Sequence, residues 1–104
     1  MVIMADQQIQ EVYKMVGHNI RRAREVANLT QEALGSKVKL SRTSINNIEN
    51  ARQKFLVHTL FDIAQACRVK PEFLLAQEGG RPFVPADLED WVSRVETAAD
   101  NQQG

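Results

Sequence analysis

Polar side chains near the middle of the chain recur at a spacing that would place them on one side of a helix. They are Arg42, Thr43, Asn46 and Asn47. Ile45 and Ile48 would face the opposite side of the same helix. Arginine can donate two hydrogen bonds to guanine, and asparagine can pair with adenine. The chemistry that these residue types allow is the reading of base edges in double-stranded DNA.

The elements that must position these side chains are two short helices separated by a tight break. Thr30 is suited to cap a helix over Gln31–Val38, and Ser41 is suited to cap one that reaches about Asn50. Lys39 falls in the break between them. Two short helices joined in this way form a helix-turn-helix unit, whose second helix can enter the major groove of DNA.

Further helices are predicted on both sides of this unit. Asp6 is expected to cap a first helix and Asn28 to end it. The apolar stripe of that helix consists of Ile9, Val12, Tyr13, Val16, Ile20, Ala23 and Ala27. Two more helices are expected over Val57–Cys67 and Pro71–Leu75, and the second should bury Phe73 and Leu74.

The C-terminal part of the chain has a different composition. Glycines and prolines predict a linker over 78–86, and Asp87 is suited to cap a final amphipathic helix within 87–104. The apolar stripe of that helix consists of Leu88, Trp91, Val92 and Val95. Three interpretations of this stripe stay open: a homodimer contact, a docking element for a partner protein, or packing against the core of the same chain. In a homodimer, Ile9, Val12 and Tyr13 of the first helix would supply the other half of the contact.

Charge is unevenly distributed although the formal net charge is zero. Residues 14–54 hold nine basic and three acidic side chains, a balance of +6, whereas residues 71–104 hold two basic and seven acidic ones, a balance of −5. A basic binding face with an acidic appendage would produce this asymmetry, and so would an ordinary solvated surface. Charge alone does not separate the two interpretations.

The segment from Val16 to Leu75 resembles the lambda-repressor-like helix-turn-helix family, also called the xenobiotic-response-element type. The resemblance is carried by the order and spacing of Gly17-x-x-Ile20-Arg21-x-x-Arg24, Leu29-Thr30-Gln31-Glu32-x-Leu34, Ser41-Arg42-Thr43-Ser44-Ile45-x-x-Ile48-Glu49-Asn50, Leu60-x-x-Ile63-Ala64 and Pro71-Glu72-Phe73-Leu74-Leu75. It implies an all-α domain of five helices. We expect that domain to cover 16–77, with residues 1–15 as an N-terminal extension of its first helix.

The resemblance also implies roles for individual residues. Arg42 and Thr43 match the principal base-reading positions, and Asn46 and Asn47 match the further ones. Contacts to the DNA backbone are expected from Thr30, Gln31, Ser41, Ser44, Asn50, Arg52 and Lys54. Gln31 also matches a residue that contacts the next glutamine or arginine in the family.

Arg24 and Glu49 match a partly buried ion pair that ties the first helix to the third. We expect this pair to be structural.

The chain departs from the family's pattern at four places. Gly35 stands where alanine is usual, and both residues are small enough for a close helix crossing. Lys39 stands where glycine is frequent, so a lysine with positive φ is expected there. Ala51 replaces the usual glycine after the recognition helix, and Phe55-Leu56 lacks the usual proline and capping residue.

Other kinds of function find little support in the sequence. The single cysteine, Cys67, falls on an apolar helix face and is expected to pack in the core. His18 and His58 have no carboxylate or cysteine at metal-ligand spacing, so we expect neither a metal site nor a cofactor. No phosphate-binding loop or catalytic constellation is present, and no apolar run is long enough for a membrane span. We therefore expect neither an enzyme nor a membrane protein.

The sequence thus indicates a DNA-binding transcriptional regulator. We expect a homodimeric repressor that binds a palindromic operator and autoregulates its own promoter. An alternative is an antitoxin-like interaction module whose acidic C-terminal helix docks a partner protein. The expected location is the cytoplasm of a bacterium, with the gene carried by the host or by a phage, and association with the nucleoid when the protein binds DNA.

Overall fold

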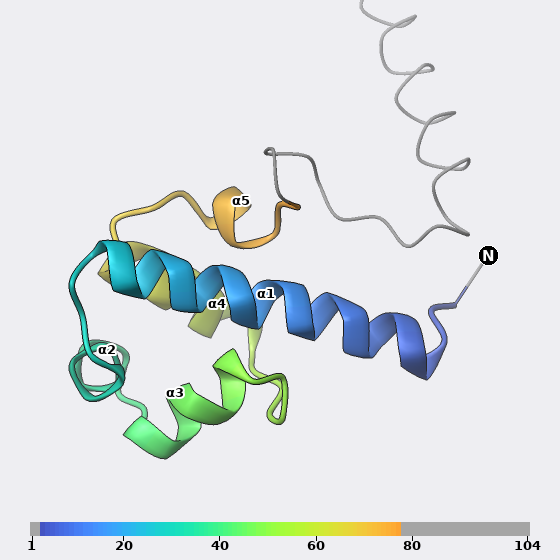
Figure 1. Ribbon diagram of the computed structural model, residues 1–104, viewed down its shortest axis with the longest axis horizontal. Coiled ribbons are helices and arrows are strands. Elements are labelled where there is room, and N and C mark those ends of the chain that lie inside the picture. Colours follow the sequence, from blue (N-terminus) through green and yellow to red (C-terminus); the bar gives the residue numbers. More distant parts are fainter. Residues whose placement is uncertain (1–2, 78–104) are drawn as a thin grey trace, which may run out of the picture.

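The computed structural model describes residues 3–77, which form an all-α domain of five helices (Figure 1). The helices are α1 (Asp6–Val26), α2 (Gln31–Val38), α3 (Arg42–Glu49), α4 (Val57–Ala66) and α5 (Pro71–Leu74). The five-helix all-α fold expected from the resemblance is therefore confirmed. The predicted linker over 78–86 and the predicted final helix within 87–104 lie outside the described residues.

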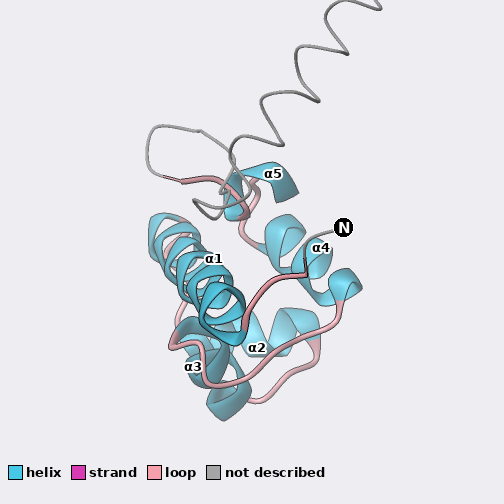
Figure 2. Ribbon diagram, turned by 90° about the vertical axis from the view of Figure 1, so that its right-hand side faces the viewer, coloured by secondary structure: helices cyan, strands magenta, loops and turns pink. Residues whose placement is uncertain are grey.

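The long helix α1 lies between the pair formed by α2 and α3 and the short helix α5. In both views α2 and α3 lie on one side of it, and α5 lies on the other (Figures 1 and 2). Every helix contributes at least one fully buried side chain to a common core. The largest of these are Ile20, Leu34, Ile45, Ile48, Ile63 and Leu74. Full burial of such a side chain contributes about 1.5–3 kcal/mol, so this core is the main source of stability that holds α3 in place.

Cys67 belongs to the same core, as the sequence predicted. The side chain is 5% exposed. Burial raises the pKa of its thiol above the ordinary value, because the apolar surroundings disfavour the thiolate. This cysteine is a packing residue.

Glycines allow two close helix contacts. A Cβ at Gly17 in α1 would lie 2.6 Å from the carbonyl oxygen of Ile48 and 2.7 Å from that of Glu49, so α3 crosses α1 at this glycine. A Cβ at Gly35 would collide with the carbonyl oxygen of Leu40. The expectation that alanine would fit equally well at position 35 is therefore wrong, because the turn after α2 folds back onto this residue.

Side-chain caps define the two short helices as predicted. The hydroxyl oxygen of Thr30 accepts a hydrogen bond from the Ala33 amide at 3.0 Å, and that of Ser41 accepts one from the Ser44 amide at 3.0 Å. Each satisfies an amide that the first turn of a helix leaves without a partner.

Each connection between consecutive helices contains one residue other than glycine with a left-handed backbone. These residues are Asn28 (φ 59°), Lys39 (φ 60°), Ala51 (φ 60°) and Arg68 (φ 59°). The expectations for Asn28 and Lys39 are confirmed. Left-handed conformations end helices readily, because they free the next amide to bond back to the last turn.

Two local predictions were wrong. Helix α1 is capped by Ala5, whose amide donates to the side-chain oxygen of Gln8, and Asp6 is instead the first helical residue. Phe73 is 48% exposed rather than buried, because α5 is a single turn that points Leu74 into the core and its neighbour away from it.

Candidate nucleic-acid interface

Helix α3 presents one polar face to solvent and one apolar face to the core. Ile45 and Ile48 are fully buried on the inner face. On the outer face, Arg42 and Thr43 are exposed, and Asn46 and Asn47 are half-buried. The four side chains proposed to read bases therefore share the outer face. The helix lies at an edge of the domain, far from α5 (Figures 1 and 2).

A shallow groove runs where the start of α2 meets the outer face of α3. It is lined by Gln31, Arg42, Thr43 and Asn46, and its volume is about 260 Å³. All four lining side chains carry hydrogen-bonding groups. The groove can therefore accept the polar edge of another molecule between the two helices.

The amino-terminal ends of α2 and α3 offer donors for an anion. Thr30 and Ser41 are exposed, and Ser44 is half-buried. Because the Ser41 hydroxyl donates to the hydroxyl oxygen of Ser44 at 3.1 Å, the hydrogen of the Ser44 hydroxyl stays available to an outside acceptor. The helix dipoles add partial positive charge at the same ends, which suits phosphate.

The loop after α3 carries the remaining polar residues expected to contact the DNA backbone. Asn50, Arg52 and Lys54 are all exposed. Asn50 turns its side-chain amide back to donate to the carbonyl oxygen of Asn46 at 2.9 Å, which leaves its side-chain oxygen facing outward.

The first half of α1 supports this loop, and no pattern in the sequence indicates that contact. Gln10 donates its side-chain amide to the carbonyl oxygen of Ala51 at 3.1 Å. The rings of Tyr13 and Phe55 meet edge to face at 5.7 Å, and the Lys54 ammonium lies 5.9 Å from the Tyr13 ring centroid. Tyr13 was expected to face a second copy, but within this chain it packs on the loop. Helical periodicity identifies the apolar face of Tyr13 but carries no information about a partner 42 positions later.

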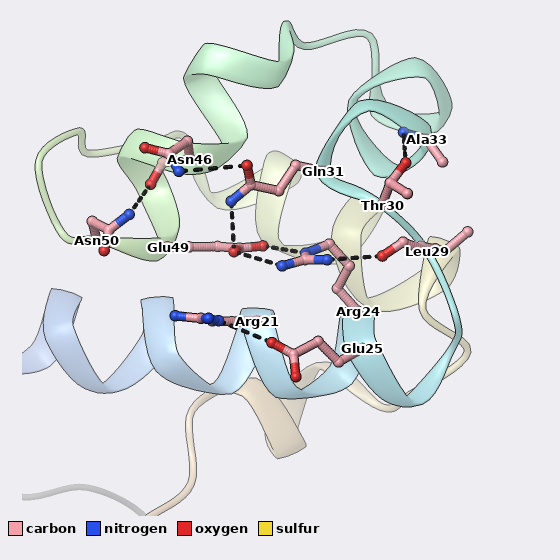
Figure 3. A network of polar contacts seen from close by, with 10 residues as sticks. All are labelled: Arg21, Arg24, Glu25, Leu29, Thr30, Gln31, Ala33, Asn46, Glu49 and Asn50. Atoms are coloured by element: carbon pink, nitrogen blue, oxygen red, sulfur yellow. Dashed lines mark hydrogen bonds and ion pairs between the residues drawn. The ribbon is translucent and has the colours of Figure 1, made fainter.

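The ion pair between Arg24 and Glu49 joins α1 to α3 beneath the outer face (Figure 3). The guanidinium donates from Nε to one carboxylate oxygen at 2.7 Å and from Nη2 to the other at 3.1 Å. Side-chain exposure is only 12% for Arg24 and 2% for Glu49. Hydrogen bonding to Glu49 raises the pKa of the Arg24 guanidinium, in spite of the opposing effect of burial. In contrast, the exposed pair Arg21–Glu25 is worth about 0–1 kcal/mol.

Two amide side chains extend this pair toward the groove (Figure 3). Gln31 donates its side-chain amide to Glu49 Oε1 at 3.1 Å. Asn46 donates its own to Gln31 Oε1 at 3.4 Å. The resemblance implied a contact of Gln31 with the next glutamine or arginine. In the structure its side-chain hydrogen bonds go instead to Asn46 and Glu49, and neither of these was foreseen.

Residues 3–77 contain neither a metal-binding cluster nor a membrane-spanning helix. No three His, Cys, Asp or Glu side chains in this part of the chain are grouped closely enough to hold a metal ion. None of the helices described here is long and apolar enough to cross a membrane.

Comparison with known proteins agrees with this geometry. A family profile described as helix-turn-helix matches residues 20–74. An uncharacterised HTH-type transcriptional regulator of Sinorhizobium fredii is 32% identical over 73 residues, which cover 70% of this chain and 95% of that protein.

Solved structures share the fold. The restriction-modification controller protein C.AhdI from Aeromonas hydrophila superposes with a TM-score of 0.57 at 23% identity, covering 62% of this chain and 96% of that one. A hypothetical transcription factor from Neisseria gives a TM-score of 0.63 at 23% identity, covering 76% of this chain and 88% of that one. The clp gene regulator ClgR from Corynebacterium glutamicum gives a TM-score of 0.60 at 16% identity, covering 88% of this chain and 85% of that one.

The profile match covers the four helices after α1 and the last turns of α1 itself, and these elements together build the groove and the polar face of α3. Members of this family bind double-stranded DNA and are regulators rather than enzymes. This chain belongs to the lambda-repressor-like helix-turn-helix family of DNA-binding transcription regulators.

Proposed function

We propose that the protein is a homodimeric repressor that binds a palindromic operator and autoregulates its own promoter. The observation that carries the proposal is the outer face of α3. It presents four side chains suited to base edges, three of which line a groove together with Gln31, while Ile45 and Ile48 on the inner face are buried in the core. A helix of this kind fits the major groove, which is about 12 Å wide.

In this proposal, the residues divide into base readers and backbone contacts. Base edges are read by Arg42, Thr43, Asn46 and Asn47. The DNA backbone is held by Thr30, Gln31, Ser41, Ser44, Asn50, Arg52 and Lys54. The exposed positions of Arg52 and Lys54 and the free hydroxyl hydrogen of Ser44 support this division.

Exposed apolar side chains support the homodimer. Leu56, Val57 and Phe61 at the start of α4 are 67%, 73% and 55% exposed. A monomer with this much apolar surface on one short segment gains from covering it. Two copies would place their α3 helices about 34 Å apart, in successive major grooves. The apolar residues Leu88, Trp91, Val92 and Val95 are a further candidate contact.

Site selection from random duplex DNA tests the proposal. The full chain should enrich a palindrome with half-sites centred about 10 base pairs apart, at an ionic strength of about 0.15 M with excess competitor DNA. DNA upstream of its own gene should contain that site and should be retarded in a gel shift. Failure to enrich any sequence would contradict the proposal.

A second candidate function rests on the acidic C-terminal part of the sequence. Residues 71–104 have a balance of −5 and contain Trp91, which suits an antitoxin-like module that docks a partner protein. Co-purification from the native host tests it. A chain that ends at Gly79 should lose the partner, and a partner that stays bound to it would exclude the tail as the docking element.

The proposed place of action is the cytoplasm of a bacterial cell, where the operator would be accessible. Whether the gene is carried by the host or by a phage does not affect this mechanism.

A further inference from the structure

A chain of hydrogen bonds leads from the buried ion pair to the exposed groove (Figure 3). It begins at Glu49, which is held by Arg24 with two hydrogen bonds. It continues through Gln31, at 3.1 Å, and ends at Asn46, at 3.4 Å from Gln31 Oε1. Three helices take part, because Arg24 lies on α1, Gln31 on α2, and Glu49 and Asn46 on α3.

Because Glu49 is a carboxylate, it determines which group donates and which accepts in each hydrogen bond of this series. A carboxylate paired with arginine has no hydrogen to donate, so only the NH₂ end of the Gln31 amide can face it. The oxygen of Gln31 must then face Asn46. Asn46 in turn must offer its own NH₂ end to that oxygen, which leaves its Oδ1 and one remaining N–H hydrogen for an outside partner.

We propose that Glu49, acting through Gln31, fixes the orientation of the Asn46 amide and so determines which base pair Asn46 accepts. The inference rests on the proposed function, in which the outer face of α3 reads base edges. Glu49 and Gln31 are positioning residues in this mechanism, and Asn46 is the residue that touches the base.

The expected target is the adenine edge in the major groove. Adenine displays an acceptor and a donor side by side, which the donor and acceptor of an asparagine amide can match. An A·T pair and a T·A pair present these groups in opposite order across the groove. To accept the reversed pair, Asn46 would have to turn its amide over. That turn breaks the hydrogen bond to Gln31 and brings two oxygen atoms together.

The test uses Gln31→Leu in the full chain, because this change cuts the chain of hydrogen bonds and leaves the Arg24–Glu49 pair intact. The direct variant, Glu49→Gln, would strand a buried guanidinium and endanger folding. Thermal unfolding should show that Gln31→Leu is folded, since Gln31 is only half-buried and lies outside the core.

The measurement is a set of affinities for duplexes based on the site that the wild-type chain selects from random DNA. Each duplex carries a different base pair at one position of a half-site. Asn46→Ala and Arg42→Ala identify the positions that these two residues read. At the Asn46 position, Gln31→Leu should reduce the preference for A·T over T·A by about threefold to tenfold, the effect of about one hydrogen bond.

Two controls separate positioning from general support. The base preference at the Arg42 position should not change in Gln31→Leu, because Arg42 lies outside the chain of hydrogen bonds. In the Asn46→Ala background, Gln31→Leu should cause no further loss of preference, because the residue through which it acts is gone.

Three outcomes would overturn the inference. If Gln31→Leu weakens binding to all duplexes equally and keeps the A·T preference, Gln31 contacts the DNA backbone or supports the fold but does not orient Asn46. If the side-chain amide signals of Asn46 in NMR spectra of the free protein are the same in wild type and Gln31→Leu, the hydrogen-bond chain does not exist in solution. If the wild-type chain enriches no sequence at all, the proposed function itself fails, and this result is distinct from the other two.

Discussion

The side chain of Arg42 is an exposed candidate for specific recognition at the start of α3. An arginine that forms two hydrogen bonds with guanine contributes about 1–3 kcal/mol of discrimination against other bases. We therefore expect Arg42→Ala to relax base preference at one position of each half-site and to leave the other positions unchanged. Competition binding with single-substituted duplexes measures this. A uniform loss across all duplexes would show that Arg42 contacts the backbone instead.

Arg52 is expected to act on DNA in a different way, because it lies in the loop after α3 rather than on its outer face. A phosphate contact carries no sequence information, so Arg52→Ala should weaken binding to all sequences by a similar factor. The slope of log K against log salt concentration should fall in magnitude by about one for each subunit. A salt titration checks the slope. Ser36→Ala, on an exposed position of α2, is a suitable control that should leave the slope unchanged.

The pair of Arg24 and Glu49 concerns stability as well as orientation. Because both side chains are largely withdrawn from solvent, removal of one leaves the other charge buried without a partner. We expect Glu49→Ala to lower the free energy of unfolding by about 3–5 kcal/mol. Urea denaturation measures the loss, with Glu25→Ala at the exposed pair as a control that should change stability by less than about 1 kcal/mol.

At the scale of elements, the close crossing of α1 and α3 depends on the absence of a Cβ atom at Gly17. Alanine favours a helix over glycine by about 1 kcal/mol, so propensity alone predicts that Gly17→Ala stabilises the protein. The two carbonyl oxygens that a Cβ would meet belong to backbone and cannot move without displacing α3. We expect a net loss of about 1–3 kcal/mol and weaker DNA binding.

Thermal unfolding and a binding titration test this outcome. His18→Ala, at the exposed neighbouring position, should change stability by less than about 0.5 kcal/mol. A Gly17→Ala variant more stable than wild type would show that the helices can separate at this point without cost.

Local signals in the sequence predicted the helices and the side of α3 on which the candidate base readers lie. The caps at Thr30 and Ser41 and the apolar spacing of Ile45 and Ile48 act within one turn of helix, so they can be read from neighbouring residues. Contacts between distant residues could not be read in this way. The packing of Tyr13 on Phe55 and the bond from Gln31 to Glu49 depend on how α1, α2 and α3 are assembled.

The same limit explains the errors. Asp6 was expected to be the N-cap of α1, because aspartate is a frequent cap. The N-cap is Ala5, one residue earlier, and its amide donates to the side-chain oxygen of Gln8. Alanine was expected to fit at position 35, because the residues adjacent to Gly35 in the sequence do not show that the Leu40 carbonyl group packs against it.

At the scale of the whole molecule, the acidic residues after Gln77 offset the basic character of the part that carries the groove. Residues 78–104 hold six acidic and two basic side chains, so a chain that ends at Gln77 would have a net charge of +4 instead of zero. We expect this shorter chain to fold, because all five helices of the core are retained. Its affinity for non-specific DNA should rise by roughly threefold to tenfold at low salt. Fluorescence anisotropy with a random duplex measures the change, and an unchanged affinity would show that the acidic tail does not oppose DNA binding.

The four left-handed residues between the helices have a practical consequence for thermal tolerance. Lys39, Ala51 and Arg68 each adopt a conformation that glycine adopts more easily, and none of them lies on the outer face of α3. Replacing all three with glycine should raise the melting temperature. Glycine relieves backbone strain in the folded state but also increases the conformational entropy of the unfolded chain. Each site at which the first free energy exceeds the second by about 0.5 kcal/mol should add about 2–4 °C. Differential scanning calorimetry measures the gain. Substitutions in the connections between helices could thus raise the thermal stability of the protein without changing the residues proposed to determine its DNA specificity.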